Sequence, residues 1–256
     1  MAEKLKLLLQ SQWQEHRNRL SLFLKAAIFA AGLFLIAQSG FGVAAIVVFI
    51  LVSVALYSRP LFENYSTFYA FLVLLPAAIL GMRILERSIL FWPGILLFSF
   101  IFYLLVGIKN LLFIKRSRLY YVAALLLFYA VFIEFFLVDK SDWFLLKYGA
   151  VILAAFLLFR EWLTIISAFS FPKRELLAAG VAAFLVAQLL WAVALLPIGF
   201  ISSANLMLLL VFVPADFLLK HFTGGISREF LIPHLVFFLA LSALIFWSSN
   251  WGLTLN

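Results

Sequence analysis

The chain is a series of long apolar runs separated by short polar connections. Each run is close to the roughly 20 apolar residues that a helix needs to cross the hydrocarbon core of a bilayer. Short connections of this kind are typical of antiparallel helices that pack beside their neighbours. The sequence therefore predicts an all-α, polytopic transmembrane helix bundle with about nine spans. The predicted spans cover residues 20–37, 42–58, 66–82, 89–108, 119–138, 143–170, 176–196, 203–219 and 231–248.

The N-terminal residues have a different pattern. Leu5, Leu8 and Trp13 recur at helical spacing among Lys, Arg and Glu residues, which predicts a short amphipathic helix lying in the membrane interface. A basic leader that only fixes the topology explains the same residues equally well. We therefore expect two parts, an amphipathic juxtamembrane segment over residues 1–19 and a single transmembrane helical domain over residues 20–256.

The composition favours a chain without a soluble domain. Hydrophobic residues make up 67% of the chain and charged residues 12%, whereas soluble domains have roughly 45–50% and about 25%. Cysteine is absent from the sequence, which excludes disulfides and thiolate chemistry. Any chemistry is expected inside the membrane or at its two faces.

The chain carries 19 Lys and Arg residues against 11 Asp and Glu residues, for a net charge of +8. With the N-terminus in the cytoplasm and the C-terminus outside, nearly all basic residues fall at cytoplasmic ends of the spans, as the positive-inside rule requires. The exceptions are Arg83, Arg87, Lys140 and Lys147. We expect the lipid bilayer and anionic headgroups at the cytoplasmic face as partners, and not nucleic acid. The span lengths and short loops favour a microbial plasma membrane.

Small residues recur along three of the predicted spans. Close approach of small residues is how helices pack in lipid, so we interpret these positions as packing faces. Similar faces can also bind other membrane proteins or a second copy of the chain. The positions are the stripe Ala179, Ala183 and Ala187 and the pairs Ala26 with Ala30 and Ala150 with Ala154.

Ionisable residues inside a span are costly and are by default candidates for function. The sixth run is interrupted only by Arg160 and Glu161, and the eighth run contains Asp216. Counting about 1.5 Å per residue places Arg160 and Asp216 at similar depth, where they can pair. The alternative is a structural ion pair without a further role.

Further charged residues follow Asp216. Together with Asp216, the carboxylate of Glu229 and the imidazoles of His221 and His234 can bind a divalent metal or relay protons. No compact metal-ligand motif is present, and a charged juxtamembrane loop that contacts headgroups explains the same residues. These residues are His221, Arg228, Glu229 and His234.

A secondary candidate lies in the fifth run. Glu134 falls about one helical turn inside the predicted outer boundary, with Tyr129 five residues earlier. Such a carboxylate can accept a proton or a cation from outside, or it can simply reach headgroup water.

Three functions remain open on these residues. The first is binding or transport of a small hydrophobic or lipid-like molecule, with a polar route through Arg160, Glu161 and Asp216 and with cavities where Pro76, Pro93 and Pro214 interrupt helices. The second is a non-catalytic subunit or scaffold of a larger membrane complex. The third is a lipid-modifying enzyme at the cytoplasmic face that uses His221 and His234. We assign no catalytic residue, metal ligand or cofactor.

Overall fold

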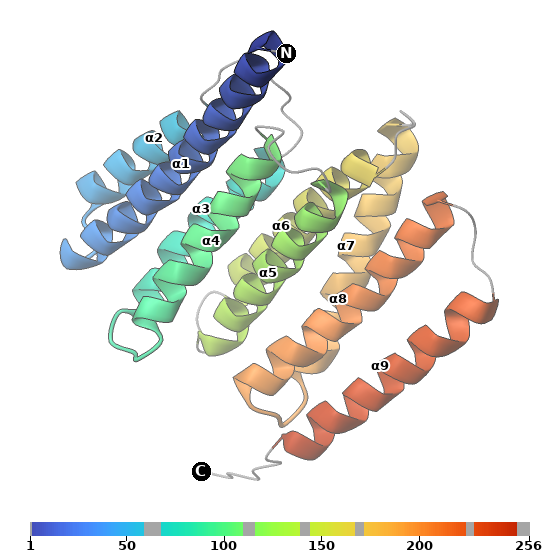
Figure 1. Ribbon diagram of the computed structural model, residues 1–256. Coiled ribbons are helices and arrows are strands. Elements are labelled where there is room, and N and C mark those ends of the chain that lie inside the picture. The colour runs from blue at the N-terminus through green and yellow to red at the C-terminus, as the bar shows by residue number, and fades with distance from the viewer. Residues whose placement is uncertain are drawn as a thin grey trace. The chain divides into compact units, whose positions relative to one another are not determined.

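The computed structural model describes residues 2–58, 68–109, 116–138, 144–166, 172–223 and 228–249. Within these residues the chain forms α-helices and no strand, which confirms the predicted all-α polytopic fold (Figure 1). Every predicted span coincides with one helix. The helices are α1 (Ala2–Gln38), α2 (Val43–Ser58), α3 (Phe68–Leu85), α4 (Phe91–Lys109), α5 (Arg116–Leu137), α6 (Phe144–Ile166), α7 (Pro172–Ala194), α8 (Phe200–Thr223) and α9 (Arg228–Ser248).

Among the described residues, eight helices are long and apolar enough to cross a membrane, and the protein is an integral membrane protein. The short helix is α2, with 16 residues. At about 1.5 Å per residue it is shorter than the roughly 30 Å hydrocarbon core. The orientation of the termini depends on whether α2 crosses, and it stays a prediction.

Two expectations about helix ends are changed by the structure. Residues 2–38 form one uninterrupted helix, so the N-terminal segment continues directly into the first span. Its position in the interface, and the division into a juxtamembrane segment and one domain, stay predictions. Pro76 lies inside α3 without ending it. Pro93 lies in the first turn of α4, where a backbone N–H would have no partner within the helix, so a proline is tolerated there.

The chain divides into two compact units, Met1–Ala123 and Ala124–Asn256, with the boundary inside α5, and each is described by itself. A chain of aromatic rings joins helices α1 to α4 of the first unit. The ring of Phe29 in α1 stacks on Phe102 in α4, with centroids 4.3 Å apart, and also contacts Phe49 in α2 at 5.1 Å. Phe71 in α3 stacks on Tyr57 in α2 at 4.1 Å and lies 6.2 Å from Phe102. These rings fill the core of the first unit.

A buried lysine completes this core. Lys109 ends α4, is only 9% exposed, and places its Nζ 2.5 Å from the carbonyl oxygen of Tyr57 and 4.8 Å from the centroid of the Tyr57 ring. Tyr57 lies at the end of α2, where carbonyl groups have no partner within the helix. Lys109 therefore caps α2 from a neighbouring helix.

In the second unit, α6 and α7 are the most closely packed pair, followed by α7 with α8 and α8 with α9. The predicted packing stripe of α7 is buried, since Ala179, Ala183 and Ala187 are 0%, 2% and 5% exposed. On α6, Ala154 is buried but Ala150 is exposed, so the predicted pair is wrong at Ala150. The buried face of α6 instead includes Ala155, the residue that follows Ala154.

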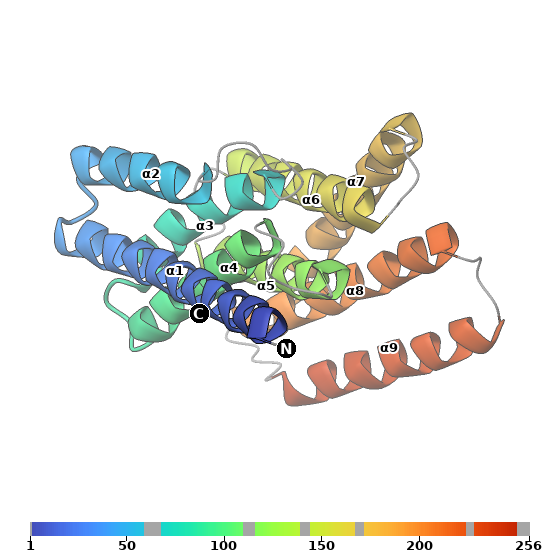
Figure 2. The ribbon, with the colours of Figure 1, turned by 45° about the horizontal axis from the view of Figure 1, so that its top comes forward.

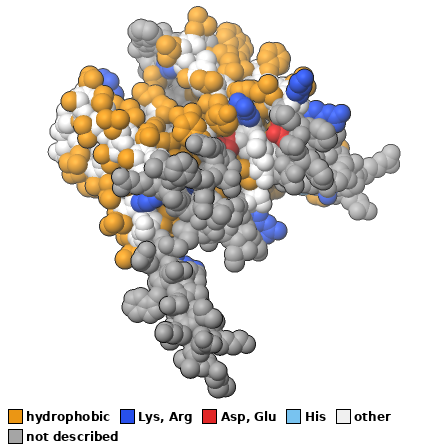
Figure 3. All heavy atoms as spheres, turned by 90° about the horizontal axis from the view of Figure 1, so that it is seen from above, with side chains coloured by type: hydrophobic (Ala, Val, Ile, Leu, Met, Phe, Trp, Pro, Cys, Tyr) orange, Lys and Arg blue, Asp and Glu red, His pale blue; other side chains and the backbone are white. Residues whose placement is uncertain are grey.

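The surface is apolar. On the face shown in Figure 3, hydrophobic side chains cover much of the described surface, and the charged groups are scattered. Helix α9 packs mainly on α8, beside which it lies in Figures 1 and 2. No residue of its apolar stretch Leu231–Ser248 is buried, whereas 61% of the residues in the apolar stretch of α4 are buried. Such exposure suits side chains that contact lipid or another membrane helix.

Two glycines provide a matched test of packing in this fold. A Cβ on Gly32 of α1 would lie 2.7 Å from Cδ2 of Phe49, which the ring of Phe29 holds in place, whereas a Cβ on Gly149 of α6 meets nothing within 4 Å. We expect Gly32→Ala to lower stability by about 1–3 kcal/mol through overpacking. Gly149→Ala is expected to be neutral or to add about 0.5–1 kcal/mol. Thermal unfolding in detergent measures both, and equal effects would contradict this close α1–α2 contact.

Candidate functional site

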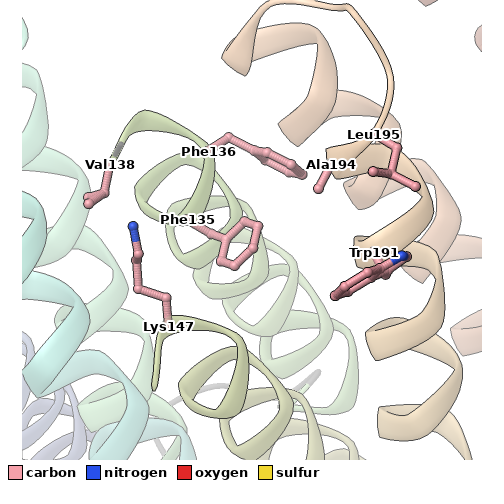
Figure 4. A pocket seen from close by; sticks show the side chains of 7 residues that line it. All are labelled: Phe135, Phe136, Val138, Lys147, Trp191, Ala194 and Leu195. Carbon is pink, nitrogen blue, oxygen red and sulfur yellow. The ribbon is translucent and has the colours of Figure 1, made fainter. Parts of the chain in front are cut away.

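The second unit contains a cavity of about 240 Å³ where α5, α6 and α7 meet at their ends. We call it the α5–α7 cavity. The last turn of α5, the first turn of α6 and the last turn of α7 contribute its walls. The lining residues, all shown in Figure 4, are Phe135, Phe136, Val138, Lys147, Trp191, Ala194 and Leu195.

Aromatic rings form most of the cavity wall. Phe135 and Phe136 meet edge to face with centroids 5.2 Å apart, and Figure 4 shows Phe136 pointing toward Ala194 and Leu195. Trp191 meets the ring of Tyr148 at 84° with centroids 6.2 Å apart. Edge-to-face pairs of this kind are favoured by the ring quadrupoles, so they hold the wall in one arrangement.

Beside the cavity, α6 is tied to α7. The hydroxyl of Tyr148 donates a hydrogen bond to the carbonyl oxygen of Ala187. Ala187 also belongs to the buried stripe of α7. The cavity therefore lies beside a hydrogen bond that joins two of its three helices.

Among the described residues that line the cavity, Lys147 is the one that carries a charge. It lies in the first turn of α6 and is half-buried, and in Figure 4 its side chain extends toward Val138. The apolar stretches of α5, α6 and α7 end or begin at Leu137, Leu145 and Ala194, so the cavity lies at the end of these spans. Lys and Trp are both favoured at this level of a bilayer, where a charged or polar end reaches water.

The secondary candidates Glu134 and Tyr129 lie on the same helix as one cavity wall. Glu134 directly precedes Phe135, and its carbonyl oxygen accepts a hydrogen bond from the Val138 N–H at 3.2 Å. Its Oε1 is buried and has no hydrogen-bond partner among the described residues. Tyr129 lies five residues earlier, which is about 140° round the helix, so the two side chains leave α5 in different directions.

The primary candidates Arg160 and Glu161 lie near the opposite end of α6, about 20 Å along the helix from Lys147. Glu161 is 1% exposed. Nearby, the Thr164 hydroxyl lies 2.9 Å from the carbonyl oxygen of Arg160 and 3.4 Å from Oε2 of Glu175, a buried residue of α7. We call these four residues the α6–α7 polar cluster.

Asp216 has a partner that the sequence did not predict. Its Oδ2 lies 3.0 Å from Nε2 of His234, so the pair joins α8 to α9. The two side chains are 18% and 24% exposed. The predicted pairing of Asp216 with Arg160 stays a prediction.

The remaining candidates are placed only by their backbone. His221 lies in α8, and Arg228 and Glu229 lie in the first turn of α9, but their side chains fall outside those that the structure describes. Among the described side chains, no group of three His, Asp or Glu residues is arranged to hold a metal ion. The hypothesis of a metal or proton site that includes His221 and Glu229 stays untested.

The sequence analysis missed the α5–α7 cavity. Its signal was present as aromatic residues and a lysine at the ends of three spans, but such residues also occur at span ends as ordinary interfacial anchors. Glu175 was missed because a carboxylate in the first turn of a helix is usually a solvated group.

Comparison of the chain with family models, with curated proteins and with solved structures found no match. The function is therefore inferred from the geometry of these residues.

The Asp216–His234 pair is expected to help hold α9 in place. Asp216→Asn and His234→Asn should each lower stability by roughly 1 kcal/mol, because the charge-assisted bond is partly shielded from water. In the double variant the two losses should not add, since one interaction is removed twice. Unfolding in detergent of the wild type, the single variants and the double variant measures this coupling, and additive losses would show that the contact contributes nothing.

Proposed function

We propose that this integral membrane protein binds a lipid-like molecule whose chain enters the α5–α7 cavity. The observation that supports the proposal is the cavity itself, with Phe135, Phe136 and Trp191 in its walls. Pockets lined by apolar and aromatic side chains with few polar groups are typical of small-molecule sites. The chemistry of the walls suits an aliphatic chain.

The position of the cavity supports a ligand that arrives through the bilayer. The cavity lies at the end of three apolar helices, and Trp191 and Leu195 in its wall are 52% and 73% exposed. A molecule dissolved in the membrane can reach these side chains without crossing water. Transport of the bound molecule across the membrane would require a second step, for which the α6–α7 polar cluster is the candidate route.

The cavity can be blocked from within one helix. Ala194→Trp places a large side chain in the cavity, whereas Ala192→Trp places the same side chain at an exposed position of α7 that does not line it. In nanodiscs, a photoreactive alkyl probe should label wild-type protein and the Ala192→Trp variant around Phe135 and Trp191. Labelling of the Ala194→Trp variant should fall about tenfold, the equivalent of about 1.4 kcal/mol of lost affinity. Equal labelling of all three proteins would exclude the cavity as the binding site.

A second candidate function, a subunit of a larger membrane complex, is favoured by α9. This helix exposes its apolar side chains, among them Leu239 at 57% and Trp247 at 92%. An exposed helix of this kind can pack against a partner helix through van der Waals contact.

A photoreactive residue in place of Leu239 separates the two candidates. If α9 contacts a partner protein, cross-linking in the native membrane should give one discrete heavier product. A photoreactive residue in place of Leu153, which is 58% exposed on α6, serves as the control. Only lipid adducts at both positions would count against the subunit function.

A further inference from the structure

We infer that the ligand of the α5–α7 cavity is a single-chain amphiphile with an anionic head, a carboxylate or a phosphate, and that Lys147 binds this head. The inference rests on the proposed function and adds the chemical class of the ligand. It depends on the position of one lysine relative to described wall residues that are otherwise apolar.

The charge of the site supports an anion. Within the part of the lining that the structure describes, Lys147 is the one charged residue, and it lies in the first turn of α6. The positive end of the α6 dipole is therefore on the same side of the cavity as the ammonium group. Both features favour a negative group and disfavour a cation.

The arrangement of charge and apolar wall supports an amphiphile. Figure 4 shows Lys147 on one side of the cavity, extending toward Val138, and Phe136, Ala194 and Leu195 on the other. A lysine binds anions as a compact point charge with three donors, so it accepts a carboxylate or a phosphate. A head at Lys147 leaves the chain attached to it in contact with the aromatic wall.

The volume supports one chain. At about 240 Å³ the cavity is smaller than the roughly 300–1,000 Å³ of typical sites for drug-sized ligands. The close packing of α6 on α7 and the bond from Tyr148 to Ala187 oppose the separation of these two walls. A phospholipid with two acyl chains is therefore a poorer fit than a single chain.

Competition among probes of equal chain length tests the inference. In nanodiscs of phosphatidylcholine, laurate, lauryl phosphate and lauryl alcohol compete with the photoreactive alkyl probe. We expect the better of the two anions to compete at least about tenfold more strongly than the alcohol, since hydrogen bonds to charged groups are stronger than those between neutral groups. The relative strength of laurate and lauryl phosphate then identifies the head that the site prefers.

Lysine variants identify the residue that binds the head. Lys147→Gln should bring both anions to the strength of the alcohol and leave the alcohol unchanged, whereas Lys147→Arg should keep the preference. Lys173→Gln, at an exposed position in the first turn of α7, is the matched control and should behave as wild type. Melting temperatures identify any variant that fails to fold. Even if a variant fails, the strength of competition by the anions relative to the alcohol, measured on the wild type, shows whether the cavity prefers an anionic head.

The outcomes separate the two proposals. Equal competition by the anions and the alcohol, or an anion preference that persists in Lys147→Gln, overturns the inference and leaves lipid binding in place. If none of the three compounds competes and Ala194→Trp does not reduce labelling, the proposed function fails.

Discussion

The second unit depends on how closely α6 and α7 approach each other. Helices in a bilayer gain nothing from leaving lipid for one another, so their association relies on contact between surfaces that fit and on hydrogen bonds that span them. The close packing of α6 on α7 provides the first, and the bond from Tyr148 to the Ala187 carbonyl provides the second. Ala187 also belongs to the buried alanine stripe of α7.

The two ends of this helix pair differ in character. At one end, Lys147 and Trp191 are brought to the same cavity together with the last turn of α5. Toward the other end, Thr164 lies within hydrogen-bond distance of Glu175, and the neighbouring Glu161 is buried. A single close contact therefore separates an apolar cavity from a polar cluster about 20 Å away along α6.

The first unit is held together by other means. Its helices are joined by stacked aromatic rings rather than by an alanine stripe, and Phe29 and Phe102 are buried where α1 meets α4. Among the residues described in this unit, Lys109 is the one buried side chain that carries a charge. Its ammonium group is stabilised there because it contacts both the end of α2 and the face of the Tyr57 ring.

The sequence by itself determined the class of the protein and the approximate limits of the described helices, because a bilayer demands about 20 apolar residues for each span whatever the tertiary packing. It also predicted the α7 stripe, since small residues four apart fall on one helix face. Of the candidate site, it predicted that Glu161 and Asp216 were unusual, because charge within a span stands out from its surroundings.

Only the tertiary structure decided the partners of these residues. Asp216 faces His234, and Lys147 shares a cavity with Phe135 and Trp191, although these residues lie far apart in the chain. Hydropathy gives the length of each helix but not its rotation or its neighbours. In a chain that is apolar on nearly every helix face, the pattern of residues alone does not identify which face is buried, and that choice determined where the cavity formed.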